Sequence, residues 1–378
     1  MKYLNLILLA SSVACRFSDD FYQILAKENA HKNLIASPIS VEIVLSMMYI
    51  AAGGKTAKQL RNTLHLAEDK EDVADSYREF FKSLQDREKS VTLHLTNRIY
   101  VNRKYRLVPD FNKLVQGSFK AKAKAINMEN PINASSIVNG WVAKQTRGKI
   151  TDIVAPSDMH SDLSTILVNA IYFEGHWQHQ FHDDDQSNEE DFHITIDKII
   201  PVEMMTFSGQ LMAANLDDLD AKVIELPYRK SNLSMRIFLP NKIDGLIKLE
   251  EKLSGFSRVL QRTSVNVKLP KFKIELSTQL SSVLKKLGIR EAFENSADFE
   301  GLVSGTGVKI DKIIQKAFLK VDESGSEAAA ATGVHIRRKR SLDNLQPSMN
   351  FIADHQFAYV IRDHKTVFFQ GHIVEPHW

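Results

Sequence analysis

Cysteine is almost absent from this sequence, since Cys15 is the only one among 378 residues. A single cysteine excludes an intramolecular disulfide framework and a zinc site built from several thiolates. An excess of charge of one sign is also missing, because 49 Lys and Arg residues face 46 Asp and Glu residues, for a formal net charge of +3. This near balance provides no general attraction to nucleic acid. With 43% hydrophobic residues and few Gly or Pro residues, the composition is that of a globular protein whose core is held by packing.

Long apolar runs are missing too. The N-terminal run Leu4–Ala10 is far shorter than the roughly 20 residues that span a bilayer. It follows Lys2 and precedes small residues up to Ala14, which is typical of a secretory signal. We therefore predict a signal peptide over residues 1–15 and a secreted, extracellular chain. The alternative is that this segment stays attached as part of the first helix.

Two sequons acquire a meaning only if the chain is secreted. They begin at Asn133 and Asn232 and are then candidate N-glycosylation sites.

The periodicity of apolar residues predicts an α+β fold. Helical spacing predicts helices over 20–29, 40–52, 72–88, 134–148 and 277–288. Alternating or continuous apolar residues predict strands over 91–101, 166–173, 223–227, 233–239, 265–269, 357–361 and 367–374. There is neither βαβ alternation nor a Pro/Gly-rich linker. The pattern favours largely antiparallel sheets in one domain, residues 16–378.

One segment near the C-terminal end does not fit a core. Small residues follow Glu323 up to Thr332, and then come the four consecutive cations Arg337, Arg338, Lys339 and Arg340, followed by Ser341. A solvated loop explains the cations but not the small residues. A processing site for a furin-like proprotein convertase would release residues 341–378, which contain two of the most strand-like segments. In a third interpretation, the cations attract a protease to an exposed loop, and the small-residue run is a hinge that becomes a strand.

Many short motifs resemble those of the serpin family, and they occur in the family's order. They are Asn33–Ser40, Val138–Val142 with Thr146–Ile150, Leu167–Trp177, Glu225–Tyr228, Leu269–Phe272, Gly288–Ile289 with Ala292–Phe293, and Ala353–His355 with Phe357. One departure is Gln356, where the family signature usually has proline. The resemblance implies three β-sheets, about nine helices and an exposed reactive-centre loop over about 323–350. The multibasic loop resembles that of insect secreted serpins that inhibit furin-like convertases.

The resemblance also implies roles for individual residues. Arg340 and Ser341 would flank the reactive bond, with specificity supplied by Arg337, Arg338 and Lys339. The inserting hinge would consist of Glu323, Gly325, Ser326, Glu327, Ala328, Ala329, Ala330, Ala331 and Thr332. The sheet would open around Ser37, Ser40, Asn169 and Trp177. The usual loop length, counted from Gly325, places the bond after Lys339; we choose Arg340 because trypsin-like proteases and convertases prefer arginine before the cut.

A serpin acts as a suicide substrate, so the resemblance implies no catalytic residue, no metal and no cofactor in this chain. Its partners would be serine proteases, held covalently by a monomeric inhibitor that binds neither nucleic acid nor membrane. The alternative is a non-inhibitory serpin of the carrier, storage or chaperone type, cleaved as a simple substrate at the multibasic site. Against this alternative, the hinge carries none of the bulky or proline residues that would block insertion.

Two further patterns have weaker support. The histidines at 176, 179 and 182 precede three aspartates, 183–185, and resemble a metal cluster, but they fall in a serpin strand-and-loop pattern without a metal. The lysines at 113, 120, 122 and 124 alternate with other residues and could attract a polyanion, although such lysines are more often a solvated edge. We predict neither a metal site nor a polyanion site.

Overall fold

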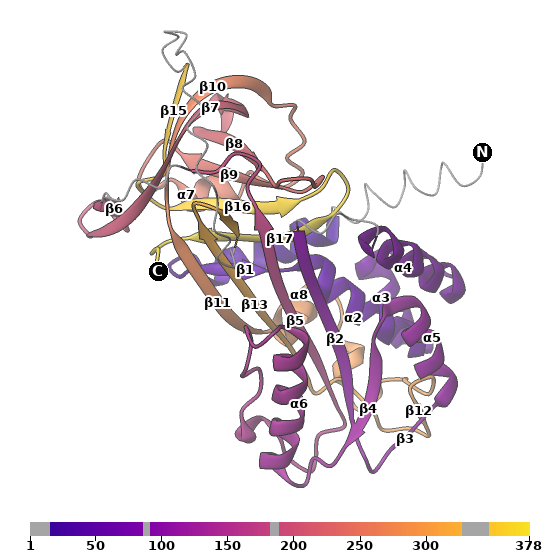
Figure 1. The fold of residues 1–378 in the computed structure, drawn as a ribbon. Helices are drawn as coiled ribbons and strands as arrows, with labels where there is room; N and C mark the ends of the chain where they lie inside the picture. The colour runs from indigo at the N-terminus through magenta and orange to yellow at the C-terminus, as the bar shows by residue number, and fades with distance from the viewer. Residues whose placement is uncertain (1–15, 86–90, 182–188, 327–347) are drawn as a thin grey trace, which may run out of the picture.

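The structure is a computed structural model that describes residues 16–85, 91–181, 189–326 and 348–378 (Figure 1). Within these ranges it contains three β-sheets and eight α-helices, which confirms the α+β fold and the three sheets and comes close to the predicted helix number. The first helix covers residues 16–28. The others are α2 (Pro38–Ala51), α3 (Gly54–Leu64), α4 (Lys70–Gln85), α5 (Pro109–Phe119), α6 (Pro131–Gln145), α7 (Leu246–Glu250) and α8 (Ser281–Lys286).

A six-stranded sheet runs the length of the molecule. Its order is β11 (Phe272–Gln279), β13 (Lys312–Asp322), β14 (Gly325–Ser326), β5 (Thr165–His176), β2 (Val91–Asn102) and β4 (Lys122–Ile126). Strand β5 is almost continuously apolar because both of its faces are covered. Below the short strand β14, β13 and β5 pair directly and in parallel.

A nine-stranded sheet lies at one end of the molecule (Figure 1). Its strands are β1 (Leu34–Ala36), β17 (Val367–Ile373), β16 (Phe357–Arg362), β9 (Ser234–Pro240), β8 (Ala221–Pro227), β7 (Ile199–Leu216), β10 (Gln261–Pro270) and β15 (Met349–Ile352), and β6 (Glu189–His193) pairs with β7. A third sheet pairs β12 (Val303–Ser304) with β3 (Arg106–Leu107).

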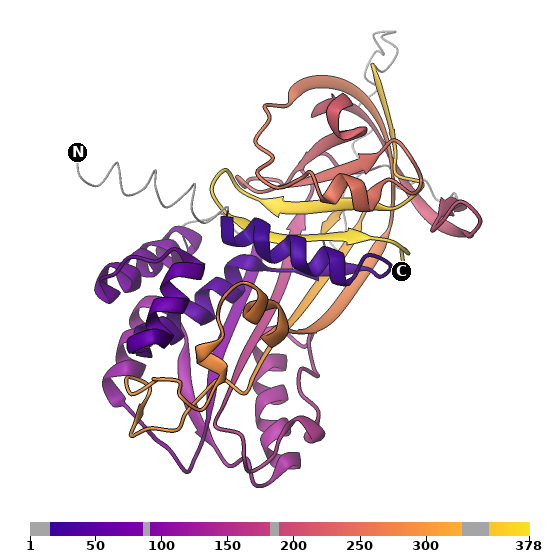
Figure 2. The same ribbon diagram turned by 180° about the vertical axis from the view of Figure 1, so that it is seen from behind.

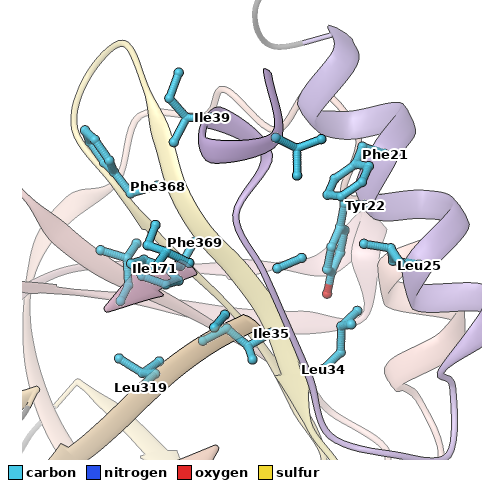
Figure 3. Close-up of a cluster of buried hydrophobic side chains, with 14 of the residues drawn as sticks. Phe21, Tyr22, Leu25, Leu34, Ile35, Ile39, Ile171, Leu319, Phe368 and Phe369 are labelled. Atoms are coloured by element: carbon cyan, nitrogen blue, oxygen red, sulfur yellow. The ribbon is translucent and has the colours of Figure 1, made fainter. Parts of the chain in front are cut away.

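The main core lies where the first helix, the β16–β17 hairpin and one face of the six-stranded sheet meet. Figure 3 shows the Tyr22 ring of the helix directed toward Leu34, with Phe21 and Leu25 of the same helix beside it and Phe369 of β17 beside Ile171 of β5. Figure 2 shows the helix lying along the hairpin from behind. A second core fills the space between the opposite sheet face and α6, whose apolar side is Ala134, Val138 and Val142. Both faces of the six-stranded sheet are therefore buried.

Helix starts follow local chemistry. Pro38 and Pro131 occupy the first turns of α2 and α6, where a missing N–H costs no hydrogen bond. The Asn130 side chain also accepts from the Asn133 N–H and caps α6.

One sequence prediction was wrong in part: Ser277–Gln279 lies in β11, so the helix predicted over 277–288 is reduced to α8. The reason is register, because these three residues pair with Ile314, Gln315 and Lys316 of β13. In the part of the chain that the structure describes, no helix is long and apolar enough to cross a membrane.

Candidate functional site at the β14 end of the six-stranded sheet

The site is the place where the chain leaves β13 and turns back into the sheet. Strand β14 has two residues and is antiparallel to both of its neighbours. Ser326 lies between Val321 of β13 and Gly175 of β5. The next residues of the chain, 327–347, are outside the described residues. Strand β14 is therefore the first part of a strand that would separate β13 from β5 if it continued.

Gly325 is required at this turn. Its φ is +152°, and a Cβ added there would lie 2.0 Å from the carbonyl oxygen of Gly175 and 2.6 Å from the Cα of His176. Both contacts are to backbone atoms of β5, which cannot rotate away. Only glycine lets β14 approach β5 closely enough to pair.

Two buried aromatic rings, those of Trp177 and Tyr228, contact the turn from inside the protein. Trp177 stacks on Tyr228 with ring centroids 4.6 Å apart, and its indole N–H donates to the carbonyl oxygen of Asp322 over 2.9 Å. The Tyr228 and Ser326 hydroxyls form a hydrogen bond of 2.7 Å. Burial raises the pKa of Tyr228, a shift that this hydrogen bond opposes, so the phenol stays neutral. The rings thus hold both sides of the turn through polar contacts to the hinge.

Ion pairs hold the outer side of the turn. Lys271 Nζ lies 2.5 Å from Glu323 and 2.8 Å from Glu203. Partial burial would lower the pKa of Lys271, but the two carboxylates outweigh it and raise that pKa above its ordinary value. The Glu323 carbonyl also accepts from the Phe181 N–H over 3.1 Å. Lys320 pairs with Asp322 over 3.4 Å.

Farther down the sheet, a buried polar cluster joins the strands that β14 would separate. Asn97, Asn169 and Gln315 lie in one row across β2, β5 and β13. Asn169 donates to Asn97 and to Ser40, and Gln315 donates to Asn169 and to the carbonyl oxygen of Ser37. The Ser37 N–H donates back to Gln315. The start of α2 is therefore fastened to the seam between β5 and β13.

The structure brings together some of the residues predicted from sequence. Glu323, Gly325, Ser326 and Trp177 meet at the turn, whereas Ser37, Ser40 and Asn169 form the polar cluster. The remaining predicted site residues lie outside the described residues; they are Glu327, Ala328, Ala329, Ala330, Ala331, Thr332, Arg337, Arg338, Lys339, Arg340 and Ser341. Four contributors were missed, namely Tyr228, Lys271, Gln315 and Asn97. Tyr228 and Lys271 stand inside the motifs Glu225–Tyr228 and Leu269–Phe272, so the family resemblance pointed to them without giving a role.

The other sequence candidates lie elsewhere. Asn133 and Asn232 are exposed, but the hydroxyl of Ser234 in the second sequon is bound to Glu225 over 2.6 Å. Residues 182–185 of the histidine–aspartate pattern are outside the described residues, and among the described ones no group of three His, Cys, Asp or Glu is placed to hold a metal ion. The lysines at 120, 122 and 124 are exposed at or next to β4, the edge strand. Gln356 donates to the carbonyl oxygen of Ile194.

Comparison with known proteins gives consistent matches over the whole length. A family model described as Serpin (serine protease inhibitor) matches residues 12–376. The chain is 45% identical over 378 residues to Serine protease inhibitor 42Dd of Drosophila melanogaster, with all of both chains covered. It is 33% identical over 382 residues to the leukocyte elastase inhibitor of Homo sapiens, covering 97% of this chain and 99% of that one. Among solved structures it resembles Serpin48 of the insect Tenebrio molitor, with a TM-score of 0.89 and 30% identity over 97% of this chain and 98% of the other.

Proposed function

The chain belongs to the serpin family of serine protease inhibitors, and from this premise we propose that it traps proteases by inserting its cleaved loop between β13 and β5. The observation that carries this proposal is β14, which already occupies the first two positions of such a strand. Loop insertion into a sheet is the switching transition for which this family is the standard example.

The chemistry belongs to the protease. Its serine Oγ attacks the carbonyl carbon of Arg340, the Arg340–Ser341 C–N bond breaks, and the amine of Ser341 leaves with a proton from the protease histidine. An ester between Arg340 and the protease serine remains. Insertion of the freed loop then carries the protease away before water can hydrolyse the ester. This chain contributes no catalytic group, and its part is the strand that inserts.

The register of β14 supports a proposal for which sheet face each inserting residue would take. Continued past Ser326, the same pairing would place Ala328 between Phe173 and Leu319, on the main-core face. Ala330 and Thr332 would follow on that face, and Thr332 would meet Asn169 and Gln315 of the polar cluster. Glu327 would point to the opposite face, between Glu174 and Lys320. The main-core face would thus receive only small side chains, and the one charged residue would fall on the opposite face between Glu174 and Lys320, which are both only partly buried.

Insertion is favourable because it replaces one ladder of hydrogen bonds, between β13 and β5, with two ladders, one on each side of the inserted strand. The parallel contact of β13 with β5 covers Lys312–Phe318 on one strand and Ile166–Tyr172 on the other. An inserted strand would replace it with two antiparallel ladders, and antiparallel pairing is slightly more stable per residue. The uncleaved form therefore stores free energy that cleavage releases.

The assignment of faces has a direct test. Ala328→Glu should turn the inhibitor into a substrate, because it forces a carboxylate into the main core, whereas Glu327→Ala should still form the covalent complex. The double variant Glu327→Ala/Ala328→Glu keeps composition and charge and only moves the carboxylate by one residue. It should behave like Ala328→Glu on denaturing gels. Equal complex yields from all three variants would contradict insertion in this register.

We further propose that the targets are furin-like convertases, trypsin-like extracellular proteases or both, and that the protein is secreted. The support for these targets is the run of cations from Arg337 to Arg340, since acidic pockets in such proteases pair with each cation. The support for secretion is the signal-like apolar run Leu4–Ala10 after Lys2. The decisive experiment mixes the purified protein separately with a furin-like convertase and with trypsin. An SDS-stable complex and a released peptide beginning at Ser341 support the proposal, whereas a peptide beginning at Arg340 places the bond after Lys339. A complex with trypsin alone removes the convertase, and clean cleavage without a complex favours a non-inhibitory serpin.

A further inference from the structure

The chain that follows β17 runs back across the molecule to the hinge. The Asn33 side chain holds its first part: Oδ1 accepts from the N–H groups of Val374 and Glu375 over 2.8 and 3.0 Å, and Nδ2 donates to the Glu375 carbonyl over 2.6 Å. The Lys273 N–H then donates to the His377 carbonyl over 2.7 Å. Figure 1 shows this end of the chain beside β11. Backbone hydrogen bonds on both sides of Pro376 therefore fix where Trp378 lies.

Trp378 is placed over two lysines that lie next to the hinge. Its ring centroid is 4.4 Å from Lys320 Nζ and 5.7 Å from Lys271 Nζ, both within cation–π distance. Trp378 is 54% exposed, so it is not there to fill the core. It is one of the few large apolar side chains left at the surface among the described residues.

Those lysines are the ones that hold the turn between β13 and β14. Lys271 pairs with Glu323, and Lys320 pairs with Asp322. Lys320 also faces Lys273 directly in the register of β11 and β13, so two like charges stand side by side. An electron-rich ring over Lys320 favours its present position, next to Asp322, over one farther out in solvent.

We propose that Trp378 is a positioning residue for the hinge: by binding Lys320 and Lys271 it keeps their ion pairs with Asp322 and Glu323 in place and so holds β14 in the sheet. The inference rests on the proposed function for its consequence, because a hinge already seated in the sheet shortens the path to insertion. The structural part of the inference, that Trp378 holds the two lysines in place, rests on the ring–lysine geometry alone.

The structural part is measured by hydrogen exchange on the uncleaved protein. The N–H groups of Trp177 and Phe181 donate to the hinge carbonyls of Ser324 and Glu323, so their exchange reports release of the turn. A cation–π contact at an exposed site contributes about 0.5–1 kcal/mol, so Trp378→Ala should speed exchange at both amides about two- to fivefold. Val259→Ala removes another exposed apolar side chain far from the hinge and should change neither amide. Unchanged exchange in Trp378→Ala would overturn the inference.

Two comparisons separate the electrostatic attraction between the ring and the ammonium groups from simple shielding of these groups from water. Trp378→Phe keeps an aromatic face and should stay closer to the wild type than Trp378→Leu, which keeps only the bulk. In a Lys320→Met background, Trp378→Ala should lose most of its effect, because the ring then has one ammonium fewer to bind. Equal retention by Leu and Phe, or full additivity with Lys320→Met, would contradict the cation–π mechanism.

The consequence for inhibition is measured as the ratio of cleaved to complexed inhibitor after reaction with trypsin. This ratio compares ester hydrolysis with insertion, and Trp378→Ala should raise it about two- to fivefold, the factor expected for exchange. If the wild type forms no complex at all, the proposed function fails, and the exchange experiment still decides the role of Trp378. If the wild type forms the complex but Trp378→Ala changes neither readout, only the inference about Trp378 fails.

Discussion

Gln315 on β13 donates a hydrogen bond of 2.7 Å to the Asn169 side chain on β5, across the seam that an inserting strand must open. The two residues are register partners and both are buried. The other amide hydrogen of Gln315 goes to the Ser37 carbonyl over 3.0 Å, and its oxygen accepts from the Ser37 N–H. One side chain thus joins β13 to β5 and to the start of α2. If the loop inserts as proposed, this cluster has to exchange hydrogen-bond partners.

Gln315→Leu should therefore destabilise the uncleaved protein. The change leaves the Ser37 N–H and the Asn169 carbonyl oxygen buried without their partner, whereas the Ser37 carbonyl keeps the Val41 N–H, and the loss costs about 1–3 kcal/mol. In urea unfolding, the midpoint of this variant should lie at a lower urea concentration than that of the wild type. Gln279→Leu is the matched control, because Gln279 is exposed at the end of β11. Equal midpoints for the two variants would show that the cluster contributes nothing to stability.

Gly325→Ala should push β14 out of the sheet. The added Cβ would meet the backbone of Gly175 and His176, and a non-glycine residue at a φ of +152° carries strain of about 1–3 kcal/mol. We expect faster hydrogen exchange of the backbone N–H of Trp177 and a higher ratio of cleaved to complexed inhibitor. Gly117→Ala in α5 is the control, since nothing lies within 4 Å of its added Cβ. An unchanged ratio in Gly325→Ala would mean that the pairing of β14 does not assist insertion.

Most of the long elements were predictable from sequence because their signals are local. The alternation over 91–101 and the apolar run over 166–173 correspond to β2 and β5, and the segments 357–361 and 367–374 correspond to β16 and β17. The long strand β7 was missed, because Gly, Pro and polar residues interrupt its alternation. The end of β11 was mistaken for helix, because Ser277–Gln279 becomes a strand only through pairing with β13.

The residues of the functional site also fall into two groups, those with a local sequence signal and those whose role depends on distant partners. The hinge was recognisable because a run of small residues next to cations is unusual in composition. Lys271 and Gln315 were not, because their roles depend on partners distant in the chain, Glu323 and Ser37 respectively, which meet only after the sheets have formed. Trp378 is the extreme case, since its contacts depend on where Asn33 and Lys273 hold the preceding residues.

Arg337→Ala should separate the two classes of target protease. A trypsin-like protease needs only the residue before the cut, whereas a furin-like convertase also reads the cation three residues earlier, which is Arg337 if the cut follows Arg340. We expect at least a tenfold loss in the rate of convertase inhibition, roughly the effect of one lost charge-assisted contact, and little change for trypsin. Equal losses for both proteases would remove the convertase from the proposal.

His372 predicts a pH dependence of stability. Its Nδ1 lies 2.7 Å from Glu250, and its Nε2 faces the carbonyl oxygens of Lys32 and Asn29 at 2.8 and 3.2 Å. Because both ring nitrogens face acceptors, the doubly protonated ring fits this site best. Burial alone would lower the pKa of His372, but the carboxylate and the two carbonyls outweigh it and raise that pKa above 6.5. Tyr22, the other titratable group at the site, donates to Glu250 and stays neutral because burial and that carboxylate raise its pKa.

A pKa that is higher in the folded than in the unfolded state means that the folded protein binds the proton more tightly. The stabilisation by His372 is therefore complete below about pH 6.5, the unfolded value, and is lost as the pH rises through the higher folded value. His372→Gln should lower the free energy of unfolding by about 3–5 kcal/mol at pH 6, because it breaks a buried ion pair, and by less at higher pH. Glu42, whose pKa burial raises to about 7, titrates in the same range, so the quantity to follow is the difference between wild type and variant. A difference that stays constant from pH 6 to pH 9 would show that His372 carries no proton that folding stabilises.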